Sequence, residues 1–229
     1  SIALDTGENI LISGYTNSIN YPATSGAFNQ SINGTRDGFI SKFNSSATKL
    51  IASTFLGGMS EERVLSLALG IDFNIYITGL TSSIDFPVTP DAFKRKFSGG
   101  NFDGFITKLN QNLSNLLYSS FLGGTGDDYG TYITVDSNKE IFIAGWTQSA
   151  DFPITPGVYA QYNNGSLDAF VCKLDIFKQA NSINIQNHNC SEMVINWKKG
   201  EGTKRIIFIK QGNSGYPTPI NNTSYNDDT

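Results

Sequence analysis

The sequence predicts an all-β protein that begins with repeated four-stranded antiparallel sheets and continues into part of a second β domain. Three observations predict this fold class. The same landmarks return about every 65 residues over positions 1–175. Within each copy, short apolar segments rich in β-branched and aromatic residues alternate with turns rich in Gly, Asn and Asp. From about residue 182 a different pattern of alternation starts.

The landmarks are glycines after an apolar segment, prolines in a long connection, and aspartates before the next apolar segment. They are Gly14, Gly79, Gly145, Pro22, Pro87, Pro153, Asp37, Asp103 and Asp168. A fixed period of this kind means that one supersecondary unit is used repeatedly and buries its faces against its neighbours.

Each copy is expected to open with a short strand, at Ile2–Asp5, Leu67–Gly70 and Ile133–Asp136. A polar turn follows, as a hairpin requires. The second strand reads ILISGYT, IYITGLT or IFIAGWT. Its density of apolar residues predicts burial on both faces.

A long connection comes next, and its repetition predicts a defined structure. Thr89-Pro90 and Thr155-Pro156 have the form of an N-cap followed by a proline in one short helical turn. The aromatic residues that follow are expected to point into the core as anchors; they are Phe28, Phe93 and Tyr159.

The third strand reads DGFISKF, DGFITKL or DAFVCKL, and the fourth reads LIASTFLGG or LLYSSFLGG. Four short antiparallel strands per repeat are typical of a blade of a β-propeller. The third copy lacks its fourth strand, so we expect residues upstream of Ser1 to supply it. Because propellers have about four to eight blades, the three copies are expected to form an incomplete propeller over residues 1–175 that depends on remaining blades of the same chain. Isolated, such an arc is expected to be poorly soluble or to associate with itself.

After a linker predicted at residues 176–189, the segment 190–229 alternates at Met193, Ile195 and Trp197 and again at Ile207 and Ile209. This rhythm predicts the first strands of a β-sandwich, of which only part is present. Both ends of the sequence are therefore expected to be cut ends.

Composition excludes several classes of partner. The chain has 16 Lys and Arg against 20 Asp and Glu, a net charge of -4, which argues against nucleic acid. No apolar run is long enough to span a membrane, so no membrane span is expected in this fragment.

The second copy reads DFPVTPDAF, DGFITKL and YSSFLGGTGDDYG in order; the first two motifs have counterparts in every copy, and the last has one in the first copy, ASTFLGGMSEERV. In this combination the chain resembles the bacterial SBBP family of seven-bladed β-propeller repeats over roughly residues 1–175. Residues 190–225 resemble the opening strands of a fibronectin type III-like domain. Together the resemblances imply a secreted or surface-displayed protein without a known chemical activity.

Recurrence decides how the acidic residues are interpreted. A catalytic acid is needed once, whereas Asp37, Asp103 and Asp168 recur in every copy, so we expect them to accept backbone hydrogen bonds at the start of the third strand. Three lysines also recur, namely Lys42, Lys108 and Lys173. An ion pair between neighbouring blades is possible for each of them.

A metal site has weak support. Asp127 and Asp128 lie in GGTGDD, which faintly resembles a glycine-rich calcium turn, but the first copy has GGMSEE there. His188 is the single histidine, which leaves no material for a histidine zinc site or a Ser-His-Asp triad in the repeats. No cofactor is expected. Cys172 and Cys190 can pair or remain thiols.

Two further features bear on binding. Trp146 stands where the other copies have Tyr15 and Leu80, so it can stack on a sugar if exposed, with core packing as the alternative. A basic cluster is expected to be a solvated face; it comprises Lys198, Lys199, Lys204, Arg205 and Lys210.

The resulting hypothesis is a non-enzymatic extracellular or cell-surface module for binding, adhesion or scaffolding, with a glycan or protein ligand on the loop face or in the central channel. The alternative is a propeller-type polysaccharide hydrolase or lyase whose active site lies in blades outside this sequence.

Overall fold

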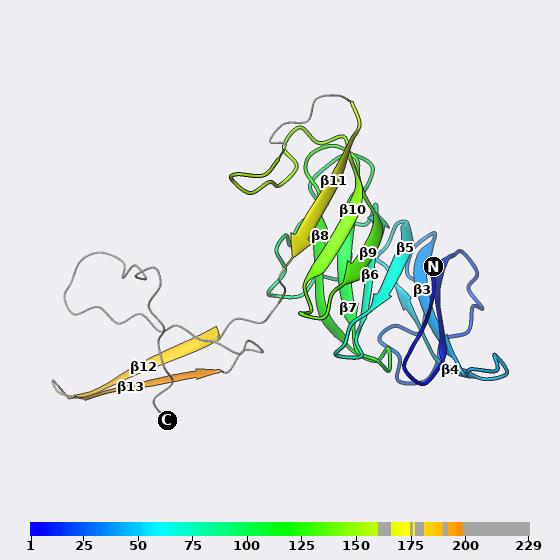
Figure 1. The fold of residues 1–229 in the computed structure, drawn as a ribbon, viewed down its shortest axis with the longest axis horizontal. Coiled ribbons are helices and arrows are strands. Elements are labelled where there is room, and N and C mark those ends of the chain that lie inside the picture. The colour runs from blue at the N-terminus through cyan, green and yellow to red at the C-terminus, as the bar shows by residue number, and fades with distance from the viewer. Residues whose placement is uncertain (160–165, 175, 177–180, 190–191, 199–229) are drawn as a thin grey trace. The chain divides into compact units, whose positions relative to one another are not determined.

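The computed structural model describes residues 1–159, 166–174, 176, 181–189 and 192–198 of the 229-residue chain. The chain divides into two compact units, Ser1–Ile176 and Phe177–Thr229, and each is described by itself. The regular elements among the described residues are all strands (Figure 1), which confirms the predicted all-β class.

The first unit contains three antiparallel sheets, one for each copy of the repeat (Figure 1). The first two have four strands in sequence order, as predicted, and in the third the described residues provide three. The strands of the first sheet are β1 Ile2–Leu4, β2 Ile10–Thr16, β3 Asp37–Phe43 and β4 Leu50–Leu56. Those of the second are β5 Glu62–Leu69, β6 Ile75–Thr81, β7 Asp103–Leu109 and β8 Leu116–Leu122. Those of the third are β9 Asp128–Val135, β10 Ile141–Thr147 and β11 Asp168–Leu174. We call the three sheets the first, second and third blade.

The first strands of the second and third blades begin earlier than predicted. β5 starts at Glu62 and β9 at Asp128, in polar segments that the sequence pattern assigns to a turn. The added residues continue the pairing beyond a bulge, since both Val64 and Ser66 have partners on β6. Strand propensity does not predict this extension, because a buried carboxylate disfavours a strand unless specific hydrogen bonds satisfy it.

The long connection forms a turn where a helical turn was predicted, and that prediction is wrong. The N–H of Ala92 donates to the carbonyl of Thr89 at 3.1 Å, which closes a β-turn. The Thr89 hydroxyl and the main chain of Ser119, on β8, hydrogen-bond each other, so this side chain does not cap a helix. Residues 156–157 also form a turn.

The predicted aromatic anchors are only partly correct. Phe28 is half-buried against the core, whereas Phe93 and Tyr159 are exposed. The aromatic residue before the repeated proline packs inward instead, because Phe86 is buried and its ring centroid lies 4.7 Å from that of Phe105. The β-turn that replaces the predicted helix changes which aromatic faces the sheet.

Two hydrophobic clusters hold the blades face to face. The first joins Leu11 and Ile40 of the first blade to Leu67 and Phe105 of the second. The other joins the second blade to the third and includes Tyr76, Ile106, Ile133 and Ile143. As a result β6 is buried at every residue, as predicted, while β2 and β10 in the outer blades are buried mainly on one face.

In the second unit, β12 (Asn181–Asn189) pairs with β13 (Glu192–Lys198) as an antiparallel hairpin, with Ile185 opposite Ile195. The strand predicted around Met193, Ile195 and Trp197 is thus present. β12 occupies much of the segment predicted as a linker. The strand predicted at Ile207 and Ile209 lies outside the described residues, as does most of the predicted basic cluster.

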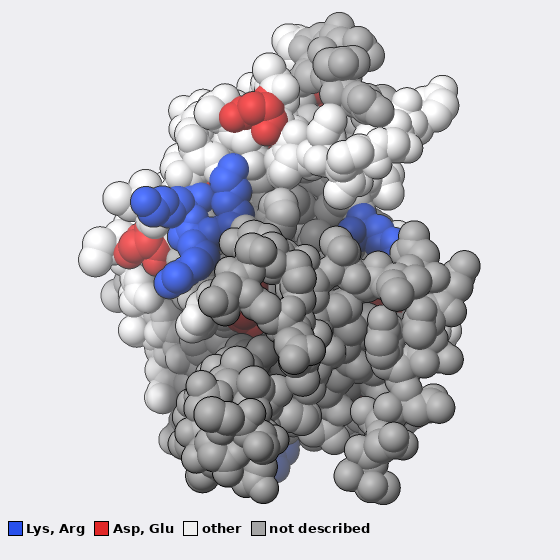
Figure 2. All heavy atoms as spheres, turned by 90° about the vertical axis from the view of Figure 1, so that its left-hand side faces the viewer, with Lys and Arg blue, Asp and Glu red and all other residues white. Residues whose placement is uncertain are grey.

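No helix in the described part of the chain is long and apolar enough to cross a membrane. Figure 2 shows one face of the molecule, on which the described surface is mostly uncharged, with Lys and Arg side chains gathered in small groups near a few acids.

Candidate functional site

The repeated aspartates lie at the starts of the third strands. Asp37 is buried and accepts the backbone N–H groups of Asn33 (2.9 Å) and Gly34 (3.0 Å). Asp103 is buried and accepts the N–H of Ser98 at 2.7 Å. Asp168 opens β11 and is partly buried. The carboxylates of Asp37 and Asp103 thus each hold the loop of their own blade.

A second pair of buried acids was not singled out together in the sequence. Glu62 accepts the N–H of Gly58 (2.9 Å) and the hydroxyl of Thr81 (2.6 Å). Asp128 occupies the matching position one repeat later and accepts the N–H of Gly124 at 2.7 Å. Their spacing by one period was the available signal, but the change from Glu to Asp and the polar surroundings concealed it.

These acids meet where blades meet. We call the contact that holds Asp37 and Glu62 the first junction, and the contact that holds Asp103 and Asp128 the second junction. Burial raises the pKa of Asp37 and of Glu62, and a neighbouring carboxylate adds to each increase. Burial, with a further contribution from Asp128, raises the pKa of Asp103 to about 6. The Oδ1 atoms of Asp103 and Asp128 are buried without a hydrogen-bond partner.

The metal candidates Asp127 and Asp128 have other contacts. Asp127 accepts hydrogen bonds from the backbone (2.5 Å) and side chain (3.1 Å) of Asn101. Ser149 donates its hydroxyl to Asp128 at 2.7 Å. The described residues contain no group of three or more His, Cys, Asp or Glu side chains placed to hold a metal ion.

The repeated lysines form ion pairs within their own blades, so the possible pairing from blade to blade is wrong. In each case the partner is an acid in the turn between the first two strands. The pairs are Lys42 with Asp5 at 2.7 Å, Lys108 with Asp72 at 3.0 Å, and Lys173 with Glu140 at 2.6 Å.

Trp146 belongs to a run of aromatic and arginine side chains near the strand ends. It is half-buried and stacks on Tyr129, with ring centroids 3.5 Å apart, and Tyr129 also contacts Phe102 at 5.7 Å. Burial raises the pKa of Tyr129, and the charges of Asp127, Arg63 and Glu61 also act on it. Tyr129 stands one period after Arg63, at the same position of the neighbouring blade.

The run continues onto the first blade. The guanidinium groups of Arg36 and Arg63 lie 5.3 and 5.6 Å from the ring centroid of Tyr15. Both also pair with Glu61, at 2.6 and 2.5 Å. Opposing bonds to one carboxylate and one ring fix the orientation of both arginines. We call this surface the rim; it comprises Tyr15, Arg36, Glu61, Arg63, Phe102, Tyr129 and Trp146.

Residues 117–153 match a family described as the SBBP β-propeller repeat. This part of the chain is similar to a propeller repeat. The match begins inside β8, includes β9 and β10, and ends at the repeated proline Pro153, so it contains Asp128 of the second junction and Tyr129 and Trp146 of the rim. No curated protein matches the chain.

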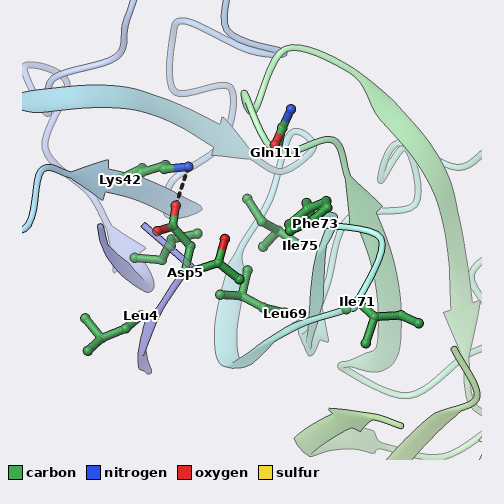
Figure 3. Close-up of a pocket in the computed structure, with 11 residues that line it drawn as sticks. Leu4, Asp5, Lys42, Leu69, Ile71, Phe73, Ile75 and Gln111 are labelled. Atoms are coloured by element: carbon green, nitrogen blue, oxygen red, sulfur yellow. Dashed lines mark ion pairs between the residues drawn. The ribbon is translucent and has the colours of Figure 1, made fainter. Parts of the chain in front are cut away.

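At the ends opposite the rim, the first two blades enclose a cavity of about 270 Å³ (Figure 3). Leu4, Leu69 and Phe73 contribute apolar walls, and the Lys42–Asp5 ion pair lies at its side. Burial tends to raise the pKa of Asp5, but hydrogen bonds from Lys42 and from nearby donors in the turn lower it to about 2. The turn holds this ion pair at one side of the cavity. The cavity is therefore a mainly apolar site with one polar side.

Cys172 lies on β11 and packs against the cluster between the second and third blades. Burial raises the pKa of its thiol to about 11, so it is protonated at neutral pH and a poor nucleophile. Cys190 and the side chain of His188 lie outside what the structure describes.

Proposed function

We propose that this chain is a non-enzymatic module for binding, adhesion or scaffolding, made of propeller blades and belonging to a secreted or surface-displayed bacterial protein. The match of residues 117–153 to a propeller repeat and the stacked antiparallel sheets support this proposal. Rigid blades present loops and strand ends at fixed positions, which suits recognition.

The observation that carries the proposal is the contrast between the junctions and the rim. Acidic residues return at each junction and hold backbone N–H groups, so they serve the scaffold. The rim changes from copy to copy: Tyr15 is followed by Leu80 and Trp146 at one position, and Arg63 by Tyr129 at another. Variation on a constant scaffold is the arrangement expected of a recognition surface.

The chemistry of the rim favours a saccharide. Aromatic rings offer flat apolar faces with which sugar C–H groups can make contact, and arginine side chains offer several donors to hydroxyl oxygens. Glu61 already pairs both arginines, which reduces their attraction for strongly anionic ligands. A glycan is therefore the preferred ligand, and a protein ligand is the alternative if nothing on a glycan panel binds.

The test is binding of the full chain to a panel of immobilised polysaccharides and glycans, compared with Trp146→Ala. Loss of one aromatic contact should weaken binding at least about tenfold, equivalent to about 1.4 kcal/mol. Tyr159→Ala removes an exposed aromatic residue that lies outside the rim and is the matched control. Equal binding by wild type and Trp146→Ala would place the ligand elsewhere, and release of reducing ends by the wild type would overturn the non-enzymatic part.

We further propose that the blades belong to a seven-bladed propeller and that the second unit opens a fibronectin type III-like domain. The hairpin of β12 and β13, with Ile185 opposite Ile195, supports a sandwich of this kind because such domains are built from paired strands with alternating apolar residues.

A further inference from the structure

The two junctions have matching backbone hydrogen bonds, and one of the side chains that differ between them carries a positive charge. At the second junction the N–H of Lys94 donates to the Ser120 hydroxyl at 2.9 Å, and at the first junction the N–H of Asn29 donates to the Thr54 hydroxyl at 2.9 Å. These matching bonds place Asn29 and Lys94 at the same position of the repeat. An ammonium group in one junction is thus replaced by a shorter, neutral amide in the other.

Lys94 fills the second junction with a positive charge. Its Nζ donates to the carbonyl of Gly123 at 2.6 Å. Its charge also acts on the pKa of Asp103, which burial raises, and on that of Asp151, which hydrogen bonds from Thr125 lower. The ammonium group is therefore bonded to a carbonyl oxygen of the junction, and its charge favours the ionised forms of two carboxylates there.

The first junction keeps the same oxygen atoms without the ammonium group. Gly57, Asp37 and Asp85 stand at the positions of Gly123, Asp103 and Asp151. The N–H of Met59 donates to Asp85 at 3.0 Å, as the N–H of Thr125 donates to Asp151 at 2.7 Å. The local backbone is thus shaped in the same way at both junctions.

A cavity of about 440 Å³ opens at the first junction, and Asn29, Gly57 and Asp85 line it. Asp37 borders Gly57 closely, since a Cβ added at Gly57 would lie 2.7 Å from the Asp37 Cγ atom. The acidic side chain of Asp85 lines an open space at the place where the neighbouring repeat has an ammonium group, and this indicates the chemistry of the missing partner. None of the three lining residues belongs to the rim, so the inference is independent of the proposed saccharide site.

We propose that this cavity binds a primary ammonium group on an unbranched alkyl chain, the chemistry of a lysine side chain on a partner protein. An ammonium group has three donors on a compact charge, which suits convergent carbonyl and carboxylate oxygens. The Lys94 side chain demonstrates the fit one repeat away.

The experiment titrates the full chain with n-butylammonium chloride and follows the backbone amide of Met59 by NMR. A saturable shift is expected in the wild type. Asn29→Lys should occupy the cavity with its own ammonium group and weaken binding at least about tenfold. Lys94→Asn should create a second site, with the amide of Thr125 now responding as well. A peptide with one central lysine, compared with its acetyl-lysine form, then tests the protein source.

Several results would overturn the proposal: an equal response in Asn29→Lys, an equal response to tetramethylammonium at the same ionic strength, or calcium chloride displacing butylammonium with higher affinity. Asp85→Asn provides a second variant, because Asp85 is exposed and its amide can still accept the Met59 hydrogen bond. Undiminished binding by this variant would also count against the site.

Discussion

At the scale of single residues, the second junction carries a cost in unpaired carboxylate oxygens that is absent at Asp37 and Glu62 of the first. Asp37 and Glu62 use their oxygen atoms in hydrogen bonds, whereas Asp103 and Asp128 each leave one buried oxygen unpaired. An unpaired buried carboxylate oxygen loses its hydration without compensation. The pKa of Asp103 is raised accordingly.

Asp103→Asn should therefore stabilise the protein at pH 7, by on the order of 1 to 3 kcal/mol, because the amide can still accept from Ser98 and can donate where Asp103 cannot. The pKa of Asp103 is about 6 in the folded state against a model value of 3.8. Between these values the folded state binds more protons, so the wild type gains stability as pH falls from about 6 to about 4. The difference between variant and wild type should shrink over that window.

Urea unfolding at pH 7 and pH 4.5 measures this effect. Asp91→Asn, at an exposed position in the same blade, is the matched control and should change stability by less than about 0.5 kcal/mol at either pH. If Asp103→Asn is less stable than wild type at pH 7, a charged Asp103 is favourable and the interpretation of the junction is wrong.

Sequence reasoning located the repeated residues better than their partners. Lys42 and Lys108 were visible from recurrence, but their acids are not in register, since Asp5 opens its turn and Asp72 lies in the middle of the corresponding one. A periodic comparison cannot find partners that shift along a turn. Of the rim, Trp146 alone was singled out from the sequence. The other members occupy repeat positions but differ in residue type from copy to copy, and their contacts arise only in the folded blades.

At the scale of elements, the strands that propensity defines were predicted well. The second, third and fourth strands carry β-branched and aromatic residues at most positions, and their bounds agree with the pattern. The predicted start of the first strand was wrong in the second and third blades, where Glu62 and Asp128 belong to the sheet. Their burial depends on backbone N–H groups of the preceding glycine turn, a tertiary compensation that local propensity does not contain.

The repeated glycines differ between blades in the atoms that an added side chain would meet. An added Cβ at Gly79 would overlap the carbonyl oxygen of Arg63, and one at Gly145 would overlap that of Tyr129. At Gly14 the nearest atoms belong to the Phe39 ring, at 3.1 Å. β5 and β9 pair with the strands that contain Gly79 and Gly145 as far as these glycines and beyond them.

Gly79→Ala should therefore destabilise the protein by about 3 kcal/mol or more, because backbone in a central blade must move. Gly14→Ala should cost less than about 1 kcal/mol, since a ring can shift slightly. Thermal and urea unfolding of the two variants measures this contrast. Equal losses would show that the repeat position requires glycine for its backbone conformation and not for the close approach of the first strand.

At the scale of the whole unit, the outer blades present faces that the central blade buries. On the third blade Tyr132 is 63% and Val171 78% exposed, while the matching Ser66 and Ile106 of the second blade are 4% and 1% exposed. On the opposite side Ile2 and Leu4 of the first blade are exposed as well. At each contact between neighbouring blades, the side of one blade that corresponds to the exposed side of the first blade packs against the side of its neighbour that corresponds to the exposed side of the third. The two exposed faces are therefore of types that pack together inside the unit.

When the 229-residue chain is produced by itself, its copies should consequently associate head to tail, the first blade of one copy against the third blade of the next. Such a heterologous contact does not close on itself and gives open oligomers. Sedimentation velocity should show association that increases with concentration. Tyr132→Lys with Val171→Lys should weaken it at least about tenfold, and so should Ile2→Lys with Leu4→Lys, because each pair places charges in an apolar contact.

Mixing the two double variants gives the sharper test. Each retains one intact face, so the mixture should form a one-to-one dimer that cannot grow, although each variant alone remains monomeric. Ile19→Lys, at an exposed position outside both faces, is the control and should associate like the wild type. A mixture that stays monomeric, or dispersal by Ile19→Lys alone, would show that association does not use blade-to-blade packing.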